Sequence, residues 1–299
     1  MIPAAPEIAA AYREVHDRIS AFLAERDGKR YREDKWDFDR GTGGGVTRIW
    51  EDANLIEKGG VNFSAIHGAS LPQAAATAFK IAPGTPYFAT GVSLVIHPHN
   101  PHVPTIHMNI RYFEAGDMWW FGGGIDLTPY QPVREEVVAF HRALKTVCEG
   151  CGEAYDQHKR TCDEYFYIKH RNEMRGVGGI FFDHLREDKP RHFELTTSLG
   201  NAFNNIYGPL ITRNSAKEFT SEQRVFQLHR RSRYVEFNLV YDRGTLFGLQ
   251  SGGRIESILM SLPAVATWRY DWSPAPGTPE HELTTVYLQP QDWAAEPDA

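Results

Sequence analysis

One segment in the first half of the chain carries side chains that could do chemistry, at regular spacing. Residues 105–113 are rich in β-branched and aromatic residues, which predicts a β-strand. Successive side chains of a strand point to opposite faces. The polar face carries His107, Asn109 and Arg111, and the apolar face carries Ile106, Met108, Ile110 and Tyr112. A titratable ring, an amide and a guanidinium are costly to bury without partners, so this polar row is a candidate functional surface.

The preceding strand, predicted over 87–97, has a matching polar row with Ser93 and His97. If the two strands form a hairpin, every pairing with an even sum of residue numbers keeps both rows on one face of the sheet. One such register places His97 opposite His107 and Ser93 opposite Arg111. Opposed Cβ atoms lie ~5 Å apart, so two imidazoles could share a metal or a substrate. For any one of these positions, the better explanation is an exposed sheet face that tolerates polar residues. For Ser93, His97, His107, Asn109 and Arg111 together, a functional site is the better explanation, because all of them share one face.

A run of three glycines, 122–124, follows the next predicted strand. It lacks the lysine of a Walker loop and the spaced glycines of a dinucleotide site. We expect these glycines to let the backbone approach a flat ligand closely. Asp126, two residues beyond the run, is either an acid, base or hydrogen-bond acceptor of the site, or an ordinary turn or helix-cap aspartate.

Two histidines fall on predicted helices. His141 points toward the apolar side of its helix, and His170 lies four residues after Phe166. Such histidines are usually satisfied members of a core. They become site candidates only if their helices cover the sheet face that bears His97 and His107.

The remaining pattern predicts one α+β domain spanning residues 1–299, in which helices pack on a large antiparallel sheet. We expect loop over 29–45 and, from the turn signal Asp242-Arg243-Gly244, a β-hairpin of strands 234–241 and 245–250. The other expected strands are 46–50, 60–66, 87–97, 105–113 and 117–122. The expected helices are 5–27, 132–148, 155–174, 192–211, 220–232 and 254–262.

Composition excludes several classes of protein. The 299 residues are 41 % hydrophobic and 12 % aromatic, which is typical of a globular chain. A formal net charge of −6 argues against broad nucleic-acid binding, and no apolar run approaches the ~20 residues of a membrane helix. No secretory signal is apparent in residues 1–10. Three cysteines, with one C-x-x-C spacing at 148–151, favour buried thiols in a reducing cytoplasm over a redox or zinc site.

Four motifs, in order along the chain, carry a family resemblance: GGGIDLTP at 122–129, KHR with RGVGGIFFD at 169–183, FNLVYDRGT at 237–245 and GGRIESILMSLP at 252–263. Together they resemble the oxygen-dependent coproporphyrinogen-III oxidase family. The resemblance covers about residues 40–272. Departures at Gln131, His184 and Ala264 affect loops and remove no motif residue.

The resemblance implies an antiparallel sheet flanked by helices on both faces, and a homodimer in which the region 234–268 contributes to the contact. It also implies a reaction: two propionates of coproporphyrinogen III become vinyl groups with loss of two CO2 and consumption of O2, giving protoporphyrinogen IX and water in haem biosynthesis. The expected location, from the cysteines, is the cytoplasm.

The resemblance also assigns site residues. It implies that His107 is a proton donor and that Asp126 and Asp242 are acidic groups at the macrocycle. The implied substrate contacts are Ser93, Asn109, Ile110, Arg111, Arg175, Arg243, Gly252, Gly253 and Arg254. The implied ligands of a divalent metal, such as Mn²⁺, are His97, His107, His141 and His170.

The residue types suit this chemistry. Arginines bind carboxylates bidentately, and the substrate carries four. A buried aspartate, Asp242 or Asp126, is a suitable acceptor for pyrrole N–H groups and could raise the electron density of one pyrrole. No flavin, nicotinamide or Fe–S motif is present, so the substrate itself would supply electrons to O2.

Four histidines without a carboxylate suit Zn²⁺ or Cu²⁺ better than Mn²⁺, and they could instead hydrogen-bond substrate carboxylates with no metal. Three other classes of protein are alternatives to this one: a non-haem metal oxygenase acting on another aromatic substrate, a tetrapyrrole carrier without activity, and a protein whose polar sheet face is only an interaction surface.

Overall fold

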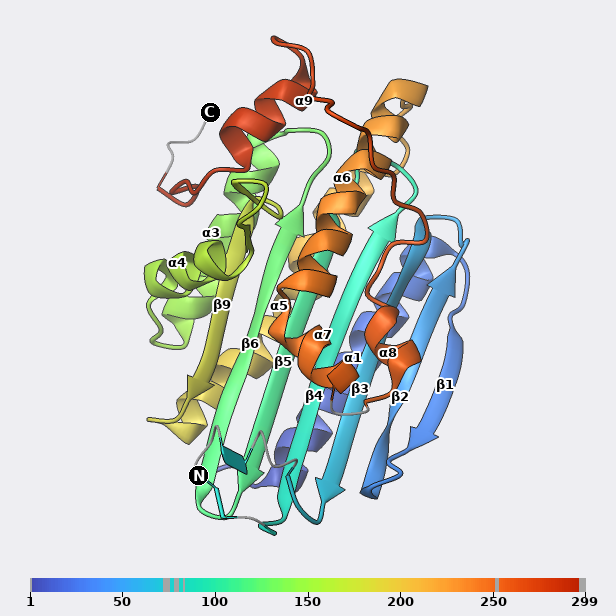
Figure 1. Cartoon of the computed structure of the whole chain (residues 1–299). Coiled ribbons are helices and arrows are strands. Elements are labelled where there is room, and N and C mark those ends of the chain that lie inside the picture. Colours follow the sequence, from blue (N-terminus) through green and yellow to red (C-terminus); the bar gives the residue numbers. More distant parts are fainter. Residues whose placement is uncertain (1, 72–75, 78–80, 83, 251–252, 296–299) are drawn as a thin grey trace.

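The fold is built on one large antiparallel sheet, shown in the computed structural model of the chain (Figure 1). The structure describes residues 2–71, 76–77, 81–82, 84–250 and 253–295. Within these residues, seven strands pair in the order β1-β2-β3-β4-β5-β6-β9, every neighbour antiparallel. The strands are β1 (Arg32–Asp37), β2 (Gly41–Glu51), β3 (Ile56–Gly68), β4 (Tyr87–Pro98), β5 (Thr105–Ala115), β6 (Met118–Thr128) and β9 (Gly178–Leu185).

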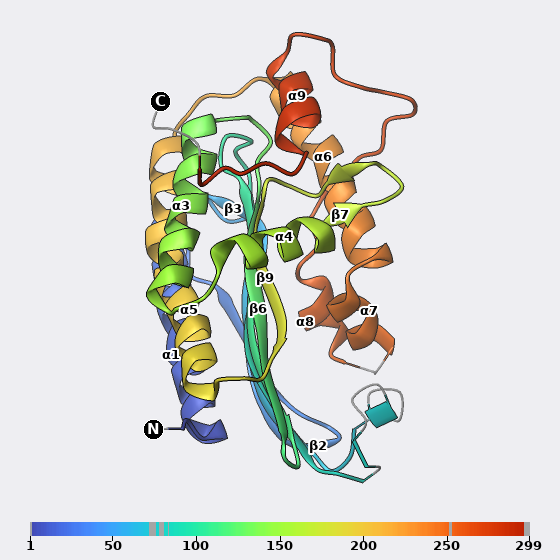
Figure 2. The same ribbon diagram turned by 90° about the vertical axis from the view of Figure 1, so that its left-hand side faces the viewer.

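Helices cover both faces of this sheet, as the expected fold class requires (Figure 2). One face is covered by α1 (Ala5–Asp27), α3 (Arg134–Gly150) and α5 (Lys189–Asn214). The other is covered by α6 (Ser221–Val240), α7 (Arg243–Gln250) and α8 (Ile255–Leu259), while α4 (Tyr155–Tyr165) lies beside β9 at the edge of the sheet. Smaller elements complete the chain: a ribbon of β7 (Tyr167–Ile168) and β8 (Glu173–Met174), the helix α9 (Pro279–Glu282) and the π-helix η1 (Leu283–Tyr287).

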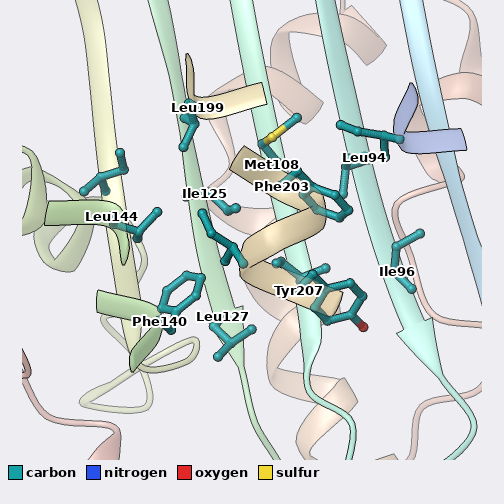
Figure 3. Packing of buried hydrophobic residues seen from close by; sticks show 14 of the residues in the cluster. Leu94, Ile96, Met108, Ile125, Leu127, Phe140, Leu144, Leu199, Phe203 and Tyr207 are labelled. Atoms are coloured by element: carbon teal, nitrogen blue, oxygen red, sulfur yellow. The ribbon is translucent and has the colours of Figure 1, made fainter. Parts of the chain in front are cut away.

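The main hydrophobic core lies between the sheet and α1, α3 and α5 (Figure 3). It contains the apolar row predicted for β5, and Ile106, Met108 and Ile110 are fully buried there. Phe140 and Leu144 of α3 and the α5 residues Leu199, Phe203 and Tyr207 pack against this row. The alternation predicted for 105–113 is therefore confirmed, and the polar row faces the opposite side of the sheet.

The register of the β4–β5 hairpin differs from the one considered above. Asn109 pairs with Ser93, and His107 pairs with Val95, two residues away from the expected His97. The ring of His97 instead contacts the Thr105 hydroxyl at 3.2 Å. In both registers the paired residue numbers have an even sum, so the polar rows share one face in either case. The two registers differ only in the length of the loop between the strands. The alternation of side chains does not determine that length.

Residues 29–45 were expected to form a loop and instead form β1 and the first half of β2. Charged β1 is an edge strand, where charged side chains are tolerated and oppose edge-to-edge association. The glycines of β2 make room for an aromatic ring: a Cβ on Gly45 would lie 2.2 Å from the indole of Trp36. That indole lines the cleft described below.

The expectation for 234–250 is also wrong, because this region is helical. The β-branched and aromatic residues that suggested strands, such as Tyr234 and Phe237, are buried on one side of α6. Asp242 does not begin a hairpin turn; its carboxylate accepts the backbone N–H of Thr245 at 2.8 Å and caps α7.

The observed secondary structure differs from the expected one at two further places: the end of one helix and an additional strand. The helix expected over 155–174 ends at residue 165, after which the chain forms the β7–β8 ribbon. Strand β9, which was not expected, completes the sheet next to β6. The helix expected over 254–262 is confirmed as the short α8.

Candidate active site

A cleft of about 370 Å³ lies over the polar face of the sheet, beneath α6, α7 and α8. Strands β3, β4 and β5 form its floor, and the ends of α4 and α6 form one wall. Many of the residues singled out from the sequence meet here. Those that line the cleft are Ser93, His107, Asn109, Arg111, Arg175, Asp242, Gly253 and Arg254.

His107, which lines the cleft, forms a hydrogen-bonded pair with Asp126. They are directly opposite each other on β5 and β6, and His107 Nδ1 lies 2.8 Å from Asp126 Oδ1. Burial raises the pKa of Asp126, but the guanidinium of Arg175 and the hydrogen bond from His107 outweigh it and hold that pKa below its ordinary value. An ionised carboxylate only accepts hydrogen bonds, so Nδ1 carries a proton and Nε2 is left for the cleft.

Arg175 supports this pair from behind. Its Nη2 donates to both oxygens of Asp126 at 2.8 Å, and its Nη1 donates to Asn238 at 2.8 Å. The guanidinium is buried and lies 4.2 Å from the ring centroid of Phe166. Both terminal nitrogens are already used, so the geometry favours a supporting role for Arg175 over the substrate contact expected from the sequence.

Removing this guanidinium should therefore destabilise the fold. We expect Arg175→Met to lower the free energy of unfolding by about 3–5 kcal/mol, because it leaves the buried Asp126 carboxylate without its guanidinium partner. Urea unfolding followed by circular dichroism measures this. The matched control is Arg243→Met, in which the lost side chain is 65 % exposed and the expected change is below about 0.5 kcal/mol. Equal effects of the two substitutions would contradict the role given to Arg175.

Asp242 lies at the junction of α6 and α7 and lines the cleft. Its carboxylate accepts the hydroxyl of Tyr165 at 2.7 Å, and the backbone N–H and hydroxyl of Thr245 at 2.8 and 2.7 Å. Burial raises its pKa, but these hydrogen bonds dominate and keep the pKa below the ordinary value. The cleft thus contains an ionised acceptor held in a fixed orientation.

The other cleft guanidiniums are held at the rim. Arg111 Nη2 lies 2.9 Å from Asp183, and Arg254 is paired with Asp34. Arg243 is mostly exposed, outside the lining of the cleft, and stacks over the ring of Tyr165 at 4.8 Å.

The four histidines expected to share a metal are not brought together. His97 contacts the backbone oxygen of Ser261 at 2.9 Å, and burial lowers its pKa well below the ordinary value. His141, on the far side of the sheet in α3, contacts the hydroxyl of Tyr155 at 2.7 Å; burial lowers its pKa to about 3.

His170 contacts Tyr241 and Glu236 near the surface, away from the cleft lining. The described part of the chain contains no group of three His, Cys, Asp or Glu side chains able to hold a metal ion. The expected four-histidine site is therefore wrong for these residues, and the donors do not fit a metal shared by them.

Two of the expected substrate contacts offer no side chain to the cleft among the described residues. The side chain of Ile110 is buried in the core on the opposite face, so only its backbone is available to the cleft. Gly252 lies outside the described residues. The substrate-contact roles of the other residues remain predictions.

The three cysteines are free and buried, as expected. Burial raises the pKa of Cys148 to about 12, so its thiol stays protonated at neutral pH.

Sequence reasoning did not identify several residues of the site: Tyr165, Asn238, Thr245, Asp183, Asp34 and Trp36. Asp183 lies in a recognised motif, which was a usable signal. Asn238 and Thr245 lie in the motif at 237–245 and carried the same signal. Tyr165 carries none, because its role depends on a contact with Asp242, 77 positions away.

The protein has an α+β fold whose large sheet carries one cleft lined by arginines, a histidine and an ionised aspartate. Such a site can bind a small polyanion and transfer protons to or from it. Residues 7–293 match the family model described as coproporphyrinogen III oxidase. The chain belongs to this family. A curated relative from Dictyostelium discoideum, named oxygen-dependent coproporphyrinogen-III oxidase, is 52 % identical over 320 residues, which cover 99 % of this chain and 96 % of the relative.

Proposed function

We propose that this chain catalyses the oxygen-dependent conversion of coproporphyrinogen III to protoporphyrinogen IX, a step of haem biosynthesis. The name of the relative at 52 % identity over nearly the full length of both chains supports this activity. The observation that carries it structurally is the convergence of Asp242, His107 and Arg111 on one cleft above a β-sheet floor.

The arrangement suits a flexible ring bearing four carboxylates. Arg111 pairs with Asp183 on β9 and Arg254 with Asp34 on β1, the two outermost strands, so they can bind separate carboxylates bidentately. Between them, the amide of Asn109 and the hydroxyl of Ser93 offer neutral polar contacts from the floor. Ring faces can pack on the indole of Trp36 and on the apolar side chains of α8.

Asp242 is the acceptor for the pyrrole N–H groups at the centre of the ring. By accepting or partly removing one proton it raises the electron density of that pyrrole, which then reacts with O2. Each propionate loses a hydride from the carbon next to the ring, and CO2 leaves. The electron pair of the broken carbon–carboxylate bond becomes the π bond of the vinyl group. Two hydrides and two protons reduce one O2 to two waters, so the substrate supplies all four electrons.

His107 serves the proton transfers of this sequence. Asp126 orients its ring and stabilises the imidazolium, so that Nε2 can deliver a proton to reduced oxygen. Asp126 and Arg175 act through His107 and make no direct contact with the reacting atoms.

The activity is tested with purified protein, coproporphyrinogen III and air. We expect protoporphyrin fluorescence after oxidation, two CO2 released per ring, and no product in an anaerobic control. A protein that binds the ring tightly without releasing CO2 would be a carrier, and the proposed activity would be wrong.

Tyr165 is expected to set the pH dependence of this reaction. Tyr165→Phe keeps the stack on Phe181, with ring centroids 4.2 Å apart, and removes one donor to Asp242. Because that hydrogen bond lowers the pKa of Asp242, its loss raises the pKa, and activity on the acid side is lost at higher pH than in the wild type. We also expect kcat to fall roughly tenfold, with KM little changed.

The pH–rate profile of kcat measures this shift. The matched control is Tyr12→Phe, which removes a hydroxyl that donates to Thr196 in the core on the opposite face and should leave the profile in place. An unmoved acid limb in Tyr165→Phe would contradict the contact's role.

A homodimer formed through residues 234–268 is also proposed. Among the described residues, eight of the eleven large hydrophobic side chains that are exposed fall between 239 and 270, including Val240 and Val265. Such a concentration of exposed apolar side chains in one segment of the chain supports an interface there.

Charges on this surface should therefore prevent assembly. We expect Val240→Asp with Val265→Asp to shift the sedimentation equilibrium from dimer to monomer, whereas the control Ile2→Asp, at an exposed position in another part of the chain, should not. A monomeric wild type would contradict the proposal.

No described helix is long and apolar enough to cross a membrane. A cytoplasmic location is proposed, and the free, buried cysteines support it, since they suit a reducing compartment.

A further inference from the structure

The arginines of the cleft and its rim already have carboxylate partners before any ligand binds. Arg175 is paired with Asp126, Arg111 with Asp183, and Arg254 with Asp34. Arg243 lies 3.8 Å from Asp183, and Asp242 faces the cleft. Among these described groups, the four positive charges of the guanidiniums equal the four negative charges of the carboxylates. A substrate with four carboxylates therefore enters a site with no excess positive charge, and some pairs must open to accept it.

The Arg111–Asp183 pair is built into the sheet. A Cβ on Gly122 would lie 2.7 Å from Arg111 Nε and 2.8 Å from Asp183 Oδ1, so glycine at this position makes the space that the pair occupies. The Nε of Arg111 is buried without a hydrogen-bond partner, which leaves one edge of the guanidinium unsatisfied. A carboxylate that took the place of Asp183 and bound through both Nε and Nη2 would gain the bidentate geometry that Arg111 lacks with Asp183.

The Arg254–Asp34 pair occupies the other side of the site. Asp34 lies on β1 and Asp183 on β9, the two outermost strands of the sheet (Figure 1). Both pairs are partly exposed, with between 17 and 37 % of each side chain accessible. Ion pairs in such settings are weak and exchange readily.

We propose that Asp34 and Asp183 are specificity-determining residues that occupy Arg254 and Arg111 in the empty cleft and are displaced by substrate carboxylates. This inference rests on the proposed function. A ligand with four carboxylates replaces both aspartates and regains the ion pairs it breaks. A ligand whose two carboxylates lie on one side of the ring reaches at most one of the two arginines, because their pairs lie at opposite edges of the sheet. When decarboxylation removes two carboxylates from the ring, the aspartates return to the arginines and favour release of the product.

Equilibrium titration of porphyrin fluorescence tests this on the full-length protein. The probes are coproporphyrin III, with four carboxylates, and protoporphyrin IX, with two. We expect Asp183→Asn to lower the Kd of coproporphyrin III five- to tenfold and the Kd of protoporphyrin IX less than twofold. Asp34→Asn should act in the same direction, and the double variant should show the product of the two effects.

The matched control is Glu51→Gln, which removes the same charge from an ion pair with Arg32 outside the cleft and should change either Kd less than twofold. If Asp183→Asn and Asp34→Asn weaken or do not change the binding of coproporphyrin III, the aspartates hold the arginines in place for the substrate and the inference is wrong. If the wild type neither binds coproporphyrin III nor releases CO2 from its reduced form, the proposed function itself fails, which is a distinct result.

Discussion

Asp242→Asn should reduce kcat by about a thousandfold, the middle of the range typical of lost acid–base groups, while coproporphyrin III still binds with nearly the wild-type Kd. The asparagine can still accept the N–H of Thr245 and cap α7, because Asn and Asp are equally good N-caps. What it loses is the negative charge that attracts a pyrrole proton. The substitution therefore separates the chemical role of this side chain from its structural one.

Initial rates of CO2 release and a fluorescence titration on the same preparation measure the two quantities. Asp188→Asn is the matched control, since Asp188 caps α5 through the N–H of Arg191 and lies outside the cleft. It should leave kcat within twofold of the wild type. A kcat near normal in Asp242→Asn would contradict the mechanism.

His107→Gln should lower kcat by about 10²- to 10⁴-fold, the usual contribution of a positioned proton donor. Glutamine keeps a polar group near Asp126 but cannot carry a proton into the cleft. Because binding of the ring relies on the arginines, KM should change little.

The corresponding control is His99→Gln, since the ring of His99 contacts the backbone oxygen of Ala53 and is not part of the cleft lining. If His107→Gln raised KM strongly and left kcat intact, His107 would be a binding group and its assignment as proton donor would be wrong.

The features that depend on backbone periodicity could be predicted from the sequence. The alternation along 105–113 correctly separated Ile106 and Met108 from His107 and Arg111, because the pleat of a strand allows no other arrangement. The fold class followed from runs of strand-forming and helix-forming residues separated by turns. The family motifs then identified most of the polar residues that the cleft brings together.

The features that depend on tertiary contacts could not be predicted from the sequence. The helix α6 continues through Val240 although its residues favour strands, because Tyr234 and Phe237 gain more by packing around Arg175 than by local preference. The metal site expected of four histidines is not formed, because Val177 and Ser261 offer backbone oxygens to two of the rings. Neither contact has a local signature.

The central claim is that one cleft holds the ring by its carboxylates and presents a pyrrole to an ionised aspartate. A crystal structure of the protein with coproporphyrinogen III, grown without O2 so that no turnover occurs, tests it most directly. We predict the ring over β3–β5, with a pyrrole nitrogen in hydrogen-bond contact with Asp242 and separate carboxylates on Arg111 and Arg254. A ring bound elsewhere, or one whose carboxylates turn to solvent away from both arginines, would contradict the account.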